Sequence, residues 1–154
     1  MIIGIPKESA AGECRVAATP NSVKKLIKLG YEIQCQSDCG QAAHFPDELY
    51  EQSGAKIIKG AEDLYQNADI LLKVLPPTEQ EVDWLRSGTL LISFVWPAQN
   101  DVLVKRLAKE RLSVLSMDCV PRISRAQKMD ALSSMANIAA VSYTHLTLPT
   151  ILLV

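Results

Sequence analysis

The sequence lacks the features that mark several classes of protein. Its 154 residues carry 16 Lys and Arg against 17 Asp and Glu, so the net charge of −1 offers no basic surface for nucleic acid. No apolar run approaches the length of a membrane span. The first residues also lack the charged segment and apolar stretch of a secretory signal. These absences favour a cytosolic protein with no nucleic-acid partner.

Metal ligands are scarce as well. The chain has 4 Cys and 2 His. Cys35 and Cys39 lie four residues apart, but only His44 and His145 could complete a site with them, and there is no second cysteine pair. We therefore expect no metal site, and we expect reduced thiols.

The glycine pattern of dinucleotide-binding turns, G-x-G-x-x-G, is also absent. The first expected strand-to-helix turn, after Ile5, carries Lys7, Glu8 and Ser9 instead. We therefore expect this chain to lack the separate dinucleotide-binding domain.

Apolar runs alternate with amphipathic segments along most of the chain. Continuous apolar runs separated by helices are typical of a parallel sheet covered on both faces. The sequence therefore predicts an open doubly wound α/β fold with a mostly parallel sheet. Strands are expected at 2–5, 31–35, 56–58, 70–75, 89–94 and 112–117, and helices at 20–29, 46–52, 60–65, 78–85 and 97–110, the last with Val102, Leu103 and Leu107 facing inward.

Helix-capping signals support two of these helices. Thr19 precedes Pro20, which suits a first helical position, and Gly30 suits a helix end. Thr78 is followed three residues later by Glu81, the spacing of a capping box.

Ligands of open α/β folds bind beyond the carboxyl ends of the strands. Four candidate residues are expected at this edge: Arg15, Lys73, Trp96 and Arg122. Lys73 lies inside an apolar run, and burying an unpaired ammonium is costly, so we expect it to be functional or paired. Arg15 has the alternative of an ion pair with Glu13 or Glu8.

The most informative stretch runs from Val120 to Asn137. A turn at Pro121 leads to Arg122, and from Met129 onward apolar residues recur at intervals of three and four, which predicts a helix. Gln127, Asp130 and Ser134 would then project together from its start. Guanidinium and amide groups beside a helix start suit an anionic or polyhydroxy ligand. The alternative is a solvated loop followed by an ordinary capped helix.

Several segments together resemble the alanine dehydrogenase/transhydrogenase N-terminal domain family over roughly Met1 to Ala139. They are IGIPKE, ECRVAATP, ILLKV, LISFVWPAQN and above all PRISRAQKMDALSSMANIA. The last looks like the arginine–glutamine–aspartate loop of proton-translocating NAD(P) transhydrogenase alpha subunits.

The resemblance implies roles for particular residues. Gln127 would hold the nicotinamide of NAD(H) and its ribose, and Arg122 and Asp130 would fix the loop and the carboxamide; these three form the expected catalytic set. Ser133 would add a hydrogen bond. The implied cofactor-binding residues are Arg122, Ile123, Ser124, Gln127, Asp130 and Ser133.

In alanine dehydrogenases resembling this chain, the residues matching Arg15 and Lys73 bind the substrate carboxylate and carbonyl, so both are expected in a substrate pocket. The catalytic histidine of those enzymes is replaced here by Trp96. Hydride transfer between two nicotinamides needs no acid–base group, so the transhydrogenase reading is preferred. An alanine dehydrogenase-like oxidoreductase and a non-catalytic binding module stay as alternatives.

The resemblance also implies the wider setting. We expect NADP(H) on a partner component, a homodimer of the alpha component, and NADP-binding and membrane components at the cytoplasmic face of the bacterial inner membrane, with this chain itself soluble. We expect the family domain to cover residues 1–139. Residues 140–154 lack a helical period and are expected to be a non-native tail, with a genuine divergent C-terminus as the alternative. Because the chain lacks the dinucleotide-binding glycines, the fragment alone is expected to be inactive.

Overall fold

The computed structural model describes residues 1–138. It divides into two units, Met1–Ser116 and Met117–Val154, and each is described by itself. The domain end expected at Ala139 and the tail expected at 140–154 lie outside the described residues.

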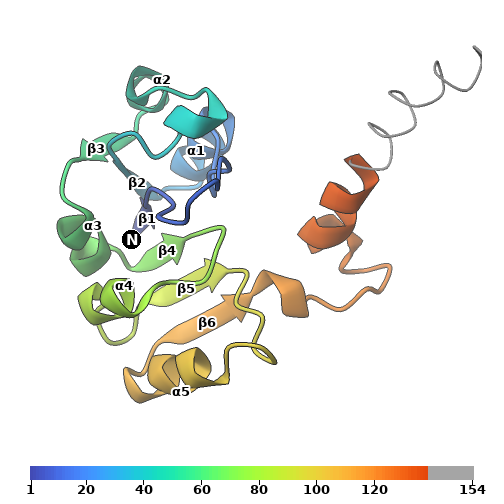
Figure 1. The fold of residues 1–154 in the computed structure, drawn as a ribbon. Coiled ribbons are helices and arrows are strands. Elements are labelled where there is room, and N and C mark those ends of the chain that lie inside the picture. The colour runs from blue at the N-terminus through green and yellow to red at the C-terminus, as the bar shows by residue number, and fades with distance from the viewer. Residues whose placement is uncertain (139–154) are drawn as a thin grey trace, which may run out of the picture. The chain divides into compact units, whose positions relative to one another are not determined.

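Six parallel strands form the sheet of the first unit, in the order β3-β2-β1-β4-β5-β6 (Figure 1). Every strand pair is parallel, so the predicted open doubly wound class is confirmed. The chain starts at β1, builds outward to β3, and then returns to β4 on the other side of β1. The strands are β1 (Ile2–Ile5), β2 (Glu32–Gln36), β3 (Lys56–Ile58), β4 (Ile70–Leu72), β5 (Leu90–Ser93) and β6 (Ser113–Ser116).

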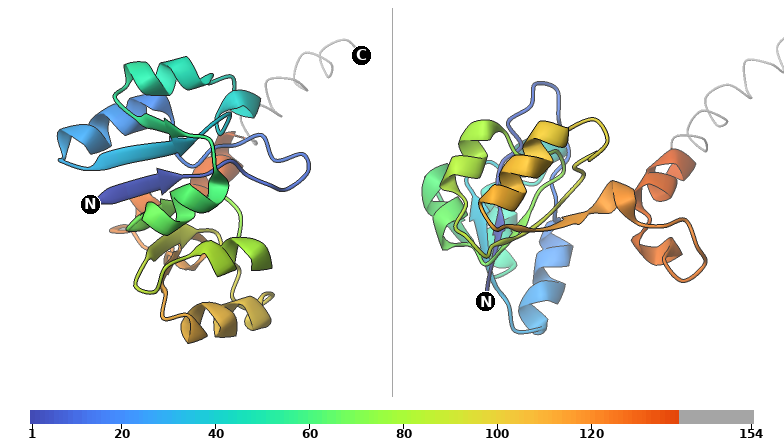
Figure 2. Two further views of the ribbon diagram at one scale, coloured as in Figure 1. Left: turned by 90° about the vertical axis from the view of Figure 1, so that its left-hand side faces the viewer. Right: turned by 90° about the horizontal axis from the view of Figure 1, so that it is seen from below.

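The helices cover both faces of this sheet (Figure 2). On one face Val23 and Tyr50 pack with Ile5 and Ile33 of the central strands. On the other face a second cluster includes Leu64, Leu71, Leu91 and Leu107. The helices of the first face are α1 (Pro20–Lys28) and α2 (Asp47–Gln52); those of the second are α3 (Ala61–Asn67), α4 (Glu79–Trp84) and α5 (Asp101–Lys109).

The predicted helix caps are confirmed. Thr19 accepts a hydrogen bond from the Ser22 amide at the start of α1, and Gly30 follows that helix with a φ of 92°. At the start of α4, Thr78 and Glu81 form the reciprocal capping box. Local side-chain chemistry therefore sets these ends.

Most predicted boundaries lie within two residues of those in the structure, and two are further off. Helix α5 starts at Asp101 rather than at Pro97. Residues 97–99 form a turn instead, in which Gln99 N donates a hydrogen bond to the Trp96 carbonyl over 2.9 Å. Val102, expected to face inward, is 77% exposed. Strand β4 stops at Leu72 rather than Leu75.

The second unit begins with two short 3-10 helices, η2 (Met117–Cys119) and η3 (Gln127–Met129). Residues 131–138 form the α-helix that was expected here. Gln127 lies in η3 and Asp130 precedes the α-helix, so the prediction that Gln127, Asp130 and Ser134 project from one helix is wrong. Within the described residues, no helix is long and apolar enough to cross a membrane.

Candidate functional site

The central strands β1 and β4 lie side by side although the chain leaves them in opposite directions across the sheet. This reversal is the switch point at which open α/β sheets bind ligands. Glu8 follows β1, and Lys73 follows β4 directly. The structure therefore places Lys73 at the edge where it was expected.

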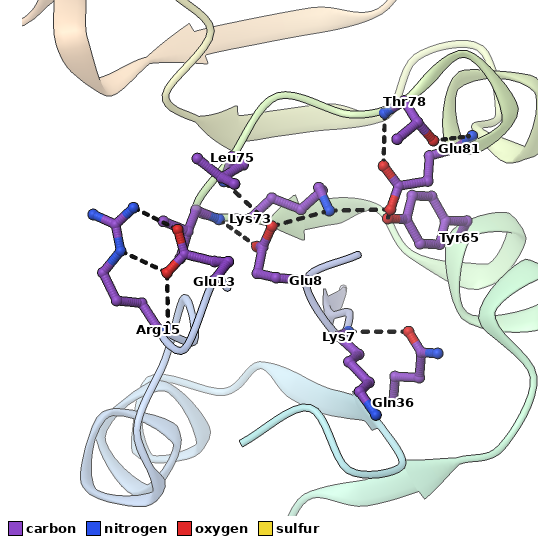
Figure 3. A network of polar contacts seen from close by, with 11 residues as sticks. Lys7, Glu8, Glu13, Arg15, Gln36, Tyr65, Lys73, Leu75, Thr78 and Glu81 are labelled. Atoms are coloured by element: carbon purple, nitrogen blue, oxygen red, sulfur yellow. Dashed lines mark hydrogen bonds and ion pairs between the residues drawn. The ribbon is translucent and has the colours of Figure 1, made fainter. Parts of the chain in front are cut away.

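The Lys73 ammonium is buried between two carboxylates (Figure 3). Its Nζ lies 3.3 Å from Glu8 Oε2 and 3.1 Å from Glu81 Oε1. The side chains of Lys73, Glu8 and Glu81 are 1%, 3% and 7% exposed. The expectation that this lysine is functional or paired is met by pairing. We call Glu8, Tyr65, Lys73 and Glu81 the Lys73 cluster.

Every carboxylate oxygen of the cluster accepts at least one hydrogen bond. Glu8 Oε1 accepts from Val74 N at 2.6 Å, and its Oε2 accepts from Leu75 N at 3.3 Å. Glu81 Oε1 accepts from the Tyr65 hydroxyl at 2.8 Å, and its Oε2 accepts from Thr78 N at 2.7 Å. Beyond Leu72 the Lys73 amide still bonds to Ile92 of β5, but the Val74 and Leu75 amides bond to Glu8 rather than to a neighbouring strand, which accompanies the early end of β4.

The electrostatics of the cluster follow from burial and charge together. Burial opposes ionisation of Glu81, but the Lys73 charge and the hydrogen bonds from Thr78 and Tyr65 outweigh it and lower the pKa of that carboxyl. Burial, with the negative charge of Glu81, raises the pKa of the Tyr65 hydroxyl. Tyr65 therefore stays a hydrogen-bond donor, and Glu81 stays an ionised acceptor.

Arg15 pairs with Glu13, one of the two partners considered for it. Its Nη2 lies 2.6 Å from Glu13 Oε2, and its side chain is 46% exposed. The hydrogen bond to Glu13, aided by the charges of Glu13 and Glu8 and opposed by burial, raises the pKa of the guanidinium. The substrate-pocket role of Arg15 and Lys73 stays a prediction.

Trp96 occupies the turn after β5. Its ring stacks on Phe94 with centroids 5.7 Å apart and an interplanar angle of 17°. Its φ of 47° is in the left-handed region, and the Asn100 side-chain amide donates to the Val95 carbonyl over 2.8 Å in the same turn. Position 96 is thus a packed aromatic in a tight turn.

A cavity of about 430 Å³ opens beside the Lys73 cluster. Its lining includes Lys7, Gln36, Tyr65, Glu81 and Trp84. Lys7 N donates to Gln36 Oε1 over 3.0 Å, which ties the segment after β1 to the end of β2. The lining mixes an ammonium, carboxylates, amides and aromatic rings.

The second unit holds a cavity of about 300 Å³. The loop 121–126, the short helix η3 and the start of the α-helix at 131–138 form it. Its lining residues are Arg122, Ile123, Ser124, Gln127, Asp130 and Ser133, the six predicted to bind the cofactor. The structure therefore brings these residues together within one unit.

Asp130 holds the helical side of this cavity. Its Oδ1 accepts from Ser133 N at 2.9 Å, and its Oδ2 accepts from the Ser133 hydroxyl. These hydrogen bonds, with a smaller contribution from the charge of Arg122, lower the pKa of Asp130. Asp130 is thus a helix cap, as the alternative interpretation held, and it also lines the cavity.

Glu8 and Tyr65 were missed as site residues from the sequence, and Glu81 was assigned to the capping box alone. The signal that could have found a carboxylate partner was Lys73 itself, because an ammonium in an apolar strand needs a counter-ion. Which acid supplies it depends on the fold.

The described residues contain no group of three or more His, Cys, Asp and Glu placed to hold a metal ion. Cys35 and Cys39 are both buried, and both are free thiols.

Comparison with known proteins shows which family the chain resembles. Residues 4–139 match the family described as "Alanine dehydrogenase/PNT, N-terminal domain". The chain is 50% identical to NAD(P) transhydrogenase subunit alpha of Cereibacter sphaeroides and 48% identical to that of Haemophilus influenzae, each over 139 residues. Both alignments cover 90% of this chain and 27% of the relative, so the chain spans about a quarter of the length of these relatives.

A solved structure agrees with the sequence comparison. The crystal structure of transhydrogenase from Sinorhizobium meliloti superposes with a TM-score of 0.86 at 40% identity, covering 90% of this chain and 40% of that one. The fold and the sequence therefore point to the same relatives.

Proposed function

We propose, because this chain belongs to the alanine dehydrogenase/PNT N-terminal domain family, that it is part of the NAD(H)-binding component of a transhydrogenase. The complete enzyme would transfer hydride between NADH and NADP⁺ and couple this to proton translocation through other components. The two relatives above carry the name NAD(P) transhydrogenase subunit alpha, which supports this reading.

The observation that carries the proposal is the cavity of the second unit. Its lining combines a guanidinium, a side-chain amide, a carboxylate and hydroxyls with the exposed apolar side chain of Ile123. Such a set fits a nicotinamide and its ribose, which present a flat ring, a carboxamide and hydroxyls. A volume of about 300 Å³ suits that end of a dinucleotide rather than the whole molecule.

The lining residues have separate tasks in this proposal. Gln127 binds the nicotinamide and its ribose, since its amide both donates and accepts hydrogen bonds. Arg122, which is exposed and lines the cavity, provides a guanidinium that contacts the carboxamide and helps hold the loop. Asp130 and Ser133 hold the loop to the following helix through their hydrogen bonds. Bound NADH supplies the hydride; the protein's task is to orient the ring.

The wider assembly follows from the same relatives. We propose that NADP(H) binds on a partner component, that the alpha component forms a homodimer, and that membrane components hold the complex at the cytoplasmic face of a bacterial inner membrane. The names of the relatives as a subunit alpha support a multi-component enzyme.

An alanine dehydrogenase activity is the second candidate, and the Trp96 position disfavours it. The ring is packed on Phe94 and has no proton to exchange near neutral pH. Pyruvate-dependent oxidation of NADH by the full-length gene product would revive this candidate.

Two arginines of one loop provide the test. Arg122 lines the cavity, whereas Arg125, three residues later, is not among its lining residues. We expect Arg122→Ala to weaken NADH binding and hydride transfer to an NADP⁺ analogue in the full-length, assembled enzyme by about tenfold or more, since a hydrogen bond from a charged donor is lost. Arg125→Ala is the matched control and should stay near wild type. Equal losses in both variants would refute the assignment of this cavity.

A further inference from the structure

Two cysteines lie close together in the core of the first unit, and the proposed function does not use them. Cys35 belongs to β2, and Cys39 lies in the turn that follows this strand. The Cys39 amide donates to the Gln36 carbonyl over 3.1 Å, so the turn folds Cys39 back onto the strand end. Both cysteines belong to one hydrophobic cluster, and they are 0% and 5% exposed.

Hydrogen bonds hold the turn that carries Cys39. Asp47, at the start of α2, accepts from the Asp38 amide at 2.9 Å and from the Ser37 hydroxyl at 2.8 Å. Asp38 has a left-handed φ of 61°, a conformation that aspartate tolerates better than most residues. Beneath the turn, the fully buried Tyr50 donates its hydroxyl to the Ala18 carbonyl over 2.9 Å. The surroundings of both thiols are therefore well ordered by their contacts.

The two thiols contact each other. A hydrogen bond between them, burial and the negative charge of Asp47 raise the pKa of the Cys35 thiol. A buried thiol that keeps its proton reacts slowly, because the thiolate is the nucleophile. The pair therefore reacts with a dissolved reagent only when the turn opens locally.

The chemistry open to such a pair is exchange with a small disulfide, RSSR. The thiolate of Cys39, the more exposed of the two, attacks one sulfur of RSSR and releases the first RS⁻. The Cys35 sulfur then loses its proton, attacks the Cys39 sulfur of the mixed disulfide and releases the second RS⁻. The two thiol protons pass to the leaving groups, so RSSR is reduced to two RSH while the protein is oxidised by two electrons.

We propose that Cys35 and Cys39 form a redox-sensitive thiol pair, which a low-molecular-weight disulfide converts reversibly to an intramolecular disulfide. The new bond ties the end of β2 to the turn before the short helix η1 (Gln41–Ala43). This inference concerns the first unit alone and does not depend on the hydride-transfer role proposed for the second.

The test is the equilibrium of this pair in a buffer of oxidised and reduced glutathione, measured on the 154-residue chain. After acid quenching and alkylation of the free thiols, trypsin cleaves at Lys28 and Lys56, with no Lys or Arg between them. Both thiols then lie on one peptide, apart from Cys14 and Cys119, and mass spectrometry gives its oxidised fraction. The equilibrium constant for the disulfide should be about tenfold or more larger in the folded chain than in concentrated urea, because the fold raises the effective concentration of one thiol at the other.

The matched control is Cys39→Ser, in which any modification of Cys35 should stop at a glutathione adduct. An equilibrium constant in the folded chain equal to or below that in urea would overturn the proposal, because the native geometry would then oppose the bond. A glutathione adduct that persists on either cysteine of the wild-type chain would overturn it too. If the chain alone does not unfold cooperatively in urea, the same peptide is measured from the full-length gene product. The arginine test above measures nucleotide binding, so the two proposals can fail separately.

Discussion

Replacing Lys73 by methionine should be one of the most damaging single changes in the first unit. Methionine has nearly the same length but no charge, so the change isolates the electrostatic contribution. It leaves the Glu8 and Glu81 carboxylates facing each other in a buried site, with side chains 3% and 7% exposed. Lys73 is the cation that both of them contact.

The magnitude can be worked from the two distances. At 3.3 and 3.1 Å each pair is worth about 5 kcal/mol of attraction at an effective dielectric of 20, before the cost of burying the charges. Removing one partner of a buried pair typically costs about 3–5 kcal/mol, because the other charge stays buried. The hydrogen bonds from Thr78 and Tyr65 stay in place, so we expect a loss of about 3 kcal/mol.

Urea unfolding at neutral pH provides the measurement. The matched control is Lys105→Met, which breaks the exposed ion pair between Lys105 and Asp101 within α5. The side chains of these two residues are 74% and 68% exposed. An exposed pair at this spacing contributes only about 0.3–0.5 kcal/mol. The loss in Lys73→Met should also shrink in acid, where protonation relieves the unpaired carboxylates. Equal, small losses in both variants would show that the buried ion pairs contribute little to stability.

Three further predictions concern single groups. Thr78→Ala should lower the free energy of unfolding in urea by about 1 kcal/mol through loss of the helix cap. The loss should exceed that of Thr19→Ala, because only the Thr78 cap also positions a carboxylate of the Lys73 cluster. A larger loss for Thr19→Ala would contradict this. The lowered pKa of Glu81 means that its ionised form contributes stability above its ordinary pKa, and that this contribution is lost as the pH falls through the lowered value. Glu81→Gln should therefore flatten the acid limb of the stability–pH curve in pH-dependent unfolding; an unchanged limb would exclude this role. Asp130→Ala should speed hydrogen exchange at the Ser133 amide, which donates to Asp130, and protection equal to wild type would show that this cap is dispensable.

Local signals in the sequence were enough for most of the fold. The apolar runs of β1 and β5 and the caps at Thr19 and Thr78 depend on neighbours within a few residues, and the structure has them as predicted. Parallel pairing follows from the alternation of strands with helices, because parallel strands need crossover connections. The strand order was not predicted and comes from the structure.

The two failed boundaries depend on one distant contact and on one local turn of unusual backbone conformation. β4 stops early because Glu8, 66 residues from Val74, takes that amide. Helix α5 starts late because Trp96 adopts a left-handed φ and its carbonyl accepts from Asn100 N at 3.1 Å in the turn. A pattern of apolar spacing cannot register either event.

The candidate site was predicted unevenly for a similar reason. The loop residues from Arg122 to Ser133 were found by resemblance, and the structure gathers them because they lie close together in sequence. Their ligand stays a prediction. Lys73 was flagged by its apolar surroundings, but its partners Glu8 and Glu81 come from segments that only the folded sheet brings together.

The Lys73 cluster also affects how the first unit unfolds. Strands β1 and β4 share two paired positions, whereas every other neighbouring pair of strands shares three or four. The sheet thus has a seam at its centre, between a half built on β1 to β3 and a half built on β4 to β6. Glu8 lies on one side of that seam and Lys73 on the other, so their ion pair fastens the halves where the ladder is shortest. Opening of the sheet along this seam therefore has to break a buried ion pair and the Val74 and Leu75 amide bonds to Glu8 in addition to the short β1–β4 ladder.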